Sequence, residues 1–139
     1  MSTNSPVARV RALRGATTVG RDRRGEVVAA TGELLVALMA GNSVLAEDVI
    51  SIVFTTTPDL TSEFPAAAAR AHGLDDVPLL CATEIAVADA PQRCVRILMH
   101  LYTVLERSEL KHVYLGGARG LRGDLTPPPD AQSGPGPGG

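Results

Sequence analysis

A short run of β-branched and apolar residues, VISIVFT at positions 49–55, most constrains how this chain can fold. The run is too short for a helix, and its apolar residues fall on both alternations of a strand. A strand that is apolar on both sides is typical of the centre of a sheet. The sequence therefore predicts a sheet with this segment near its middle.

Three further strands are predicted around that segment. Alternating apolar and basic residues at 8–13 indicate a first strand that ends at Arg14, where Gly15 permits a sharp exit. Residues 77–82 and 111–115 indicate the third and fourth strands.

Apolar residues at helical spacing predict three helices. The first is capped by Asp22 and stops at Gly41, and the second spans 65–73, with proline at its start and glycine at its end. The third opens at 90–91 and reaches residue 105. Its apolar stripe would consist of Cys94, Leu98, Leu101 and Leu105.

Strands and helices thus alternate along the chain, which predicts an α/β (α+β) fold, a single domain with a mixed or mostly parallel sheet covered by helices. Residues 8–125 would form the domain, residues 1–7 a flexible leader, and the Pro/Gly-rich residues 126–139 a disordered tail. Helices on one face only would leave the other face needing a partner. A core this small also favours a ligand site between subunits, and hence a closed homo-oligomer.

Composition argues against several classes of partner. With 13 Lys+Arg against 15 Asp+Glu and 3% aromatic residues, the chain has neither a basic block nor a stacking platform for nucleic acid. No apolar run approaches the roughly 20 residues of a membrane span, and no signal-peptide core is present, so the expected location is the cytoplasm. Cys81 and Cys94 lack metal or redox spacing and are expected to be reduced.

The usual catalytic signatures are missing. The sequence has no P-loop, no G-x-S-x-G, no H-E-x-x-H and no dinucleotide fingerprint. His72, His100 and His112 are far apart in the sequence and have no carboxylate at ligand spacing. We therefore expect no metal site.

Charged and polar residues at the ends of predicted strands and helices are more informative. Arg14, Arg96 and Arg122 would bind a small dianion if they converged, although the helical pattern equally allows a solvated Arg96. Glu84 follows a strand end, where α/β sheets place ligands, or is an ordinary loop acid. Tyr114 is either a core tyrosine or a residue at a pocket rim.

Seven short motifs together identify a family. They are RGATTV at 14–19, TPDL at 57–60, FPAAAAR at 64–70, CATE at 81–84, CVR at 94–96, HVYL at 112–115 and LR at 121–122. In this order and spacing, over residues 11–125, the chain resembles the monofunctional trimeric chorismate mutases of the AroH type. The resemblance implies a homotrimeric pseudo-α/β-barrel with three active sites between adjacent chains. It also implies the rearrangement of chorismate to prephenate for phenylalanine and tyrosine synthesis, without cofactor or metal.

The resemblance also implies roles for individual residues. Arg14 and Tyr114 would hold substrate carboxylate, Arg96 would donate to the ether oxygen, and Glu84 would take the ring hydroxyl. The implied catalytic residues are therefore Arg96, Glu84 and Arg14, with Cys81 lining the side of the hydroxyl. The residues implied to line or close the pocket are Phe64, Ala66, Arg70, Leu121 and Arg122.

Two positions depart from the family pattern. Ala67 stands where the family usually has lysine, and Leu80 stands where it usually has threonine. Loss of a cation at the pocket mouth would weaken capture of a dianion. One alternative is thus a non-catalytic metabolite-binding or regulatory trimer on the same scaffold. Another is a Rid-like imine deaminase of similar trimeric fold, which would place its carboxylate-binding arginine in a context unlike RGATT.

Overall fold

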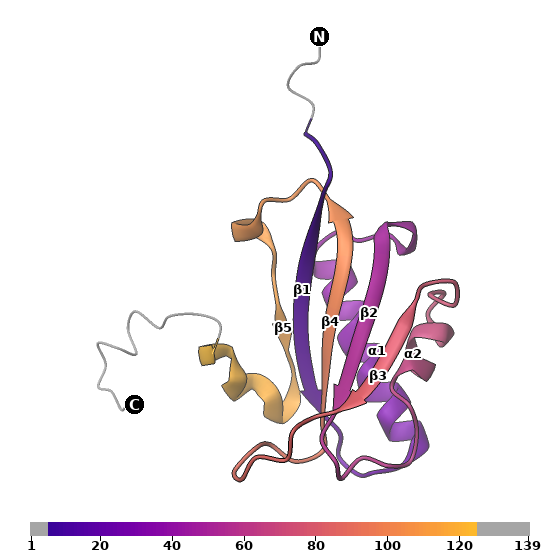
Figure 1. The fold of residues 1–139 in the computed structure, drawn as a ribbon, viewed down its shortest axis with the longest axis vertical. Coiled ribbons are helices and arrows are strands. Elements are labelled where there is room, and N and C mark those ends of the chain that lie inside the picture. The colour runs from indigo at the N-terminus through magenta and orange to yellow at the C-terminus, as the bar shows by residue number, and fades with distance from the viewer. Residues whose placement is uncertain (1–5, 125–139) are drawn as a thin grey trace, which may run out of the picture.

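The computed structural model describes residues 6–124, and their side chains up to Leu121 (Figure 1). Most of the predicted leader and the whole predicted tail therefore lie outside the described residues. The strands are β1 (Arg9–Thr18), β2 (Val49–Thr56), β3 (Leu79–Thr83), β4 (Cys94–Thr103) and β5 (Val113–Tyr114). The helices are α1 (Arg24–Gly41) and α2 (Ala66–Ala71), with three 3-10 helices, η1 (Ala46–Asp48), η2 (Arg107–Glu109) and η3 (Gly116–Asp124).

The strands form one mixed sheet in the order β3-β2-β4-β1-β5. β4 pairs antiparallel with both β1 and β2, whereas β3 is parallel to β2 and β5 is parallel to β1. The prediction of a mixed sheet in a single domain is confirmed, with the apolar run at 49–55 in β2. The pairing of β2 with β4 is irregular between Val49 and Ser51, so Ile50 is an extra residue on β2.

The predicted third helix is wrong, because most of that segment is strand β4. Val95, Ile97, Met99 and Leu101 alternate toward the buried face of the sheet, and the residues between them face the other side. This period of two competes with the helical stripe in the same residues. The segment forms a strand because β1 and β2 pair with it on both sides and bury one of its faces.

The first strand and the first helix also begin or end differently from the prediction. β1 does not stop at Arg14 but continues through Gly15 to Thr18. Asp22 does not cap α1, whose N-cap is Arg23 without a side-chain hydrogen bond. The carboxylate of Asp22 instead accepts hydrogen bonds from the backbone N–H groups of Thr61 and Ser62.

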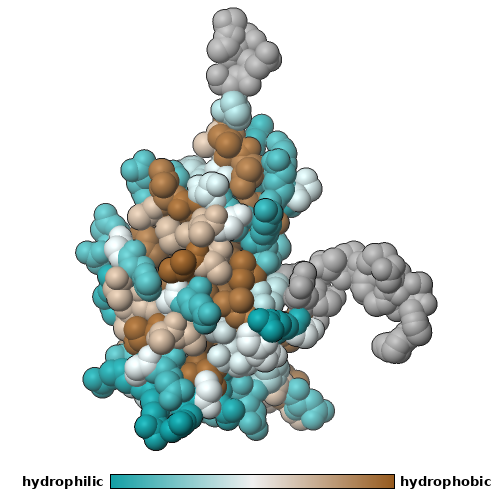
Figure 2. Space-filling view, turned by 180° about the vertical axis from the view of Figure 1, so that it is seen from behind, coloured by the Kyte–Doolittle hydropathy of each residue, from teal (hydrophilic) through white to brown (hydrophobic). Residues whose placement is uncertain are grey.

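The two α-helices pack on one face of the sheet and lie behind it in Figure 1. Leu34, Leu35 and Leu38 of α1 are fully buried against core residues of β1, β2 and β4, such as Leu13 and Phe54. Seen from the side of the helices, apolar and hydrophilic residues are intermixed on the surface (Figure 2). This layer supplies the core.

The opposite face of the sheet, which we call the open face, carries no α-helix of the described chain. Only η3 packs at one end of it, where Ala118 and Leu121 contact the cluster of Ala16, Cys94 and Tyr114. Elsewhere the open face exposes apolar side chains. Val10 is 54%, Leu80 63% and Tyr102 52% exposed.

Candidate active site

One row of paired residues crosses the open face from β2 to β5. Thr55 pairs with Arg96, Arg96 with Ala16, and Ala16 with Tyr114. Residues paired directly across strands point to the same side of a sheet. The register therefore places Thr55, Arg96 and Tyr114 on the same face, around the small side chain of Ala16.

A cavity of about 230 Å³ lies along this row. Arg14, Arg96 and Tyr114 supply its polar groups, and the surrounding residues are mostly apolar. The remaining lining residues are Gly15, Ala16, Val53, Thr55, Ile97 and Leu98. Two guanidinium groups and a phenol in an apolar setting form a site for a small anionic molecule.

An ion pair borders this cavity. The Arg96 Nε lies 2.9 Å from Glu84 Oε2, and the side chains are only 28% and 17% exposed. The same carboxylate oxygen accepts a hydrogen bond of 2.6 Å from the Thr55 hydroxyl. Because the pair is largely shielded from water, it holds both side chains more firmly than an exposed pair would.

The Nε–H of Arg96 is not directed at Glu84, despite the short distance. This buried nitrogen has no hydrogen-bond acceptor among the described residues. A buried donor without an acceptor costs about 1–3 kcal/mol, so such groups are rare outside functional sites. Arg96 is therefore a fixed cation at the wall of the cavity.

Arg14 is positioned through its backbone. Its N–H donates to Nδ1 of His112 at 3.0 Å, which links β1 to the residue just before β5. The pKa of His112 is lowered, first because the imidazole is partly buried and second because the Arg14 guanidinium lies nearby. The neutral ring is the form that accepts this hydrogen bond.

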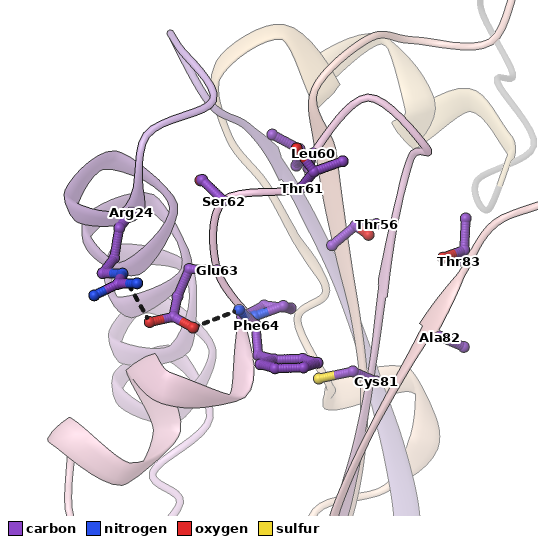
Figure 3. A pocket seen from close by; sticks show the side chains of 11 residues that line it. Arg24, Thr56, Leu60, Thr61, Ser62, Glu63, Phe64, Cys81, Ala82 and Thr83 are labelled. Carbon is purple, nitrogen blue, oxygen red and sulfur yellow. Dashed lines mark hydrogen bonds and ion pairs between the residues drawn. The ribbon is translucent and has the colours of Figure 1, made fainter.

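Phe64 and Cys81 lie around a different hollow, of about 390 Å³ (Figure 3). The Phe64 ring, which is 68% exposed, and the Cys81 sulfur point toward each other across it. At its edge Arg24 pairs with Glu63 at 3.4 Å. Within one chain, these residues do not line the cavity that contains Arg14 and Arg96.

The other predicted pocket residues are dispersed. Ala66 is buried in the core at the start of α2, and Arg70 is exposed at the end of that helix. Leu121 packs on the cluster that contains Tyr114, next to the cavity. Arg122 follows in η3, but its side chain lies outside the described part of the structure.

The remaining reactive groups do not add a nucleophile or a metal set. Burial raises the pKa of the Cys94 thiol to about 11, although the nearby Arg96 favours the thiolate. Among residues 6–121, no group of three or more His, Cys, Asp or Glu side chains is placed to bind a metal ion. None of the described helices is long and apolar enough to cross a membrane.

Known proteins are similar to this chain in sequence and in fold. The profile of the family described as chorismate mutase type I matches residues 10–125. The chain is 37% identical to chorismate mutase AroH of Bacillus subtilis (strain 168), over 84% of this chain and 93% of that protein. It is 42% identical to chorismate mutase AroH of Thermus thermophilus, over 84% and 96%. A solved chorismate mutase from Clostridium thermocellum superposes with a TM-score of 0.77 at 43% identity, over 78% of this chain and 97% of that one.

The chain belongs to the chorismate mutase type I family.

Three residues beside the cavity are not among the site residues predicted from the sequence. Thr55 donates to Glu84, and Val53 and Leu98 form the apolar wall. Val53 and Thr55 lie two residues apart in the predicted strand at 49–55, so the sequence alone indicates that both side chains point to the same face of the sheet. The position of Leu98 could not be inferred, because Cys94, Leu98, Leu101 and Leu105 also fit the apolar stripe of a helix.

Proposed function

We propose that this member of the chorismate mutase family rearranges chorismate to prephenate, and that the cavity on the open face is its active site. The observation that carries the proposal is that Arg14, Arg96 and Tyr114 line one cavity, with Glu84 2.9 Å from Arg96 at its border. A pericyclic rearrangement needs no nucleophile, no general base and no metal. It needs a substrate held in a reactive conformation and a donor where negative charge develops.

Each residue of the cavity then has a role. Arg14 and Tyr114 bind substrate carboxylate and hold the enolpyruvyl arm over the ring, which lowers the entropic part of the barrier. As the ether carbon–oxygen bond breaks and a carbon–carbon bond forms between the enolpyruvyl arm and the ring, negative charge grows on the ether oxygen, and the Arg96 guanidinium stabilises it. Glu84, held by Thr55, binds the ring hydroxyl.

The proposal includes a homotrimer that works in the cytoplasm. Its support is the open face, where Val10, Leu80 and Tyr102 are exposed on the same side of the sheet as the cavity and a neighbouring chain would cover them. Phe64 and Arg70 then act on the cavity of an adjacent chain, which accounts for their distance from Arg96 within one chain. Leu121 and Arg122 would close the cavity from η3.

The direct test mixes the purified chain with chorismate and follows the loss of its absorbance in the presence of EDTA. We expect conversion to prephenate without added cofactor, because the proposed steps use only side chains. Binding of chorismate without conversion would instead support a regulatory trimer. A requirement for an added divalent ion would refute the mechanism.

A further inference from the structure

The two ion-paired residues of the site lie on either side of one loop, residues 85–93, which lies below the sheet in Figure 1. Glu84 precedes the loop, and its N–H donates to the Thr56 carbonyl at 2.9 Å. Arg96 is the third residue of β4, just beyond the other end. The relative placement of the two side chains therefore depends on how both ends of this loop are fixed.

The TPDL motif fixes the second end. The Asp59 carboxylate accepts the Arg93 N–H at 3.1 and 3.0 Å and the Thr57 hydroxyl at 2.6 Å. That hydroxyl oxygen also accepts the Cys94 N–H at 2.9 Å, and the Thr57 N–H donates to the Cys94 carbonyl. Asp59 thus holds Arg93, the last residue of the loop, and Thr57 holds Cys94, the first residue of β4.

Arg93 needs this support because its backbone is left-handed, with φ 48°. This conformation is unfavourable for residues with a Cβ other than Asn and Asp. Arg93 is also bonded to the residue that follows β1, since its carbonyl accepts the Val19 N–H at 2.8 Å and its Nε donates to the Val19 carbonyl at 2.9 Å. The strained residue is therefore held from both sides, three positions before Arg96.

We propose that Asp59 is a positioning residue for the reaction, which sets the Arg96 guanidinium against Glu84 by holding Arg93 in its left-handed conformation. The inference rests on the proposed function for its kinetic consequence. Without the carboxylate, Arg93 relaxes to negative φ, the start of β4 turns, and the Arg96 donor moves away from the reacting oxygen. Small displacements of such a donor are costly in rate.

The test compares Asp59→Ala with Glu109→Ala. Glu109 is the matched control, because its carboxylate accepts the Glu106 N–H at 2.7 Å beyond the opposite end of β4. We expect Asp59→Ala to lower kcat by roughly tenfold to a hundredfold with little change in KM, since the donor acts in the transition state. Glu109→Ala should keep the kcat of the parent protein. Asp59→Asn, which retains one acceptor oxygen, should fall between the parent and Asp59→Ala, and it serves if the alanine variant fails to fold.

A readout without substrate separates this inference from the proposed function. The ¹H–¹⁵N signal of the Arg96 Nε–H, assigned by its loss in Arg96→Ala, should shift in Asp59→Ala and stay in place in Glu109→Ala. It should also move back toward its original position in Asp59→Ala/Arg93→Asn, because asparagine tolerates the left-handed conformation better than arginine. If the parent protein were inactive on chorismate, the proposed function would be refuted. The Arg96 signal would then still test the positioning role of Asp59. An unchanged Arg96 signal in Asp59→Ala, or equal shifts in both variants, would overturn the positioning role.

Discussion

The Arg96 guanidinium combines a partly buried charge, an ion pair with Glu84 and a place in the wall of the cavity. Replacing Arg96 with Ala should therefore lower kcat by roughly a hundredfold or more, by analogy with the loss of an oxyanion-hole donor. Lysine should rescue poorly, because it keeps the charge but lacks the planar fork that serves two oxygens together.

Steady-state kinetics on folded protein checks this prediction. Arg21→Ala is the matched control, since the Arg21 side chain is 68% exposed and lies 3.9 Å from its carboxylate partner, Glu26. Arg93 is unsuitable as a control because it anchors the start of β4. Equal, small changes in Arg96→Ala and Arg21→Ala would mean that Arg96 is a solvated arginine without a role in the reaction.

His112 gives the folded chain a dependence on pH. Its pKa is lowered on folding, so between that value and the ordinary 6.5 the unfolded chain binds more protons than the folded one. The unfolding free energy should therefore fall as pH drops below 6.5. Protonation also removes the Nδ1 acceptor of the Arg14 N–H.

Urea unfolding at pH 7.5 and pH 5 of the parent and of His112→Gln measures this effect. Glutamine can still accept a hydrogen bond but does not titrate, so its variant should lose less stability on acidification. The same loss in both proteins would show that other groups cause the acid sensitivity.

The contact between β1 and α1 depends on Gly15. A Cβ at this position would lie 3.0 Å from side-chain carbons of both Leu34 and Leu38, and 3.1 Å from the Val113 carbonyl oxygen. Gly15→Ala should therefore lower the unfolding free energy by about 1–3 kcal/mol, as overpacked cores do.

Gly25→Ala is the control for that change, because a Cβ at Gly25 would meet no atom within 4 Å apart from its chain neighbours and the backbone of α1. This variant should be as stable as the parent or gain up to about 1 kcal/mol from helix propensity. Chemical denaturation distinguishes the two results. A harmless Gly15→Ala would mean that α1 can move away from β1.

Local patterns predicted most strands and helices but failed where two periods coexist. Residues 94–103 satisfy a helical stripe through Leu98 and Leu101 and also alternate as a strand, and only the neighbours β1 and β2 decide between them. The motifs named Arg14, Arg96, Glu84 and Tyr114 as site residues, and the structure places all four around one cavity or at its border. Their register could not be predicted, since it depends on pairing between strands far apart in sequence.

Assembly should depend on the open face. Val53 lies on this face beside the cavity, whereas Val36 is half exposed on the solvent side of α1. We expect light scattering to give three chains for the parent and for Val36→Glu, because Val36 faces away from the proposed interface. Val53→Glu should give a smaller assembly, since it places a charge where chains would meet.

Circular dichroism should show that both glutamate variants keep their secondary structure. Activity should follow the assembly state, because the proposed site draws Phe64 and Arg70 from a neighbour. A trimer that survives Val53→Glu would place the interface elsewhere, and a fully active single chain would refute the shared site.

The extra residue Ile50 on β2 has a consequence for how chains of this kind can change length during evolution. A residue gained or lost between Ser51 and Thr55 would turn Thr55 away from Arg96 and toward the helices, because strand side chains alternate. A residue gained or lost before Ser51 would leave that pairing intact, since the irregularity already absorbs one. Insertions and deletions should therefore accumulate before Ser51 and in loops, and single-residue ones should be absent from the paired stretch that carries the site.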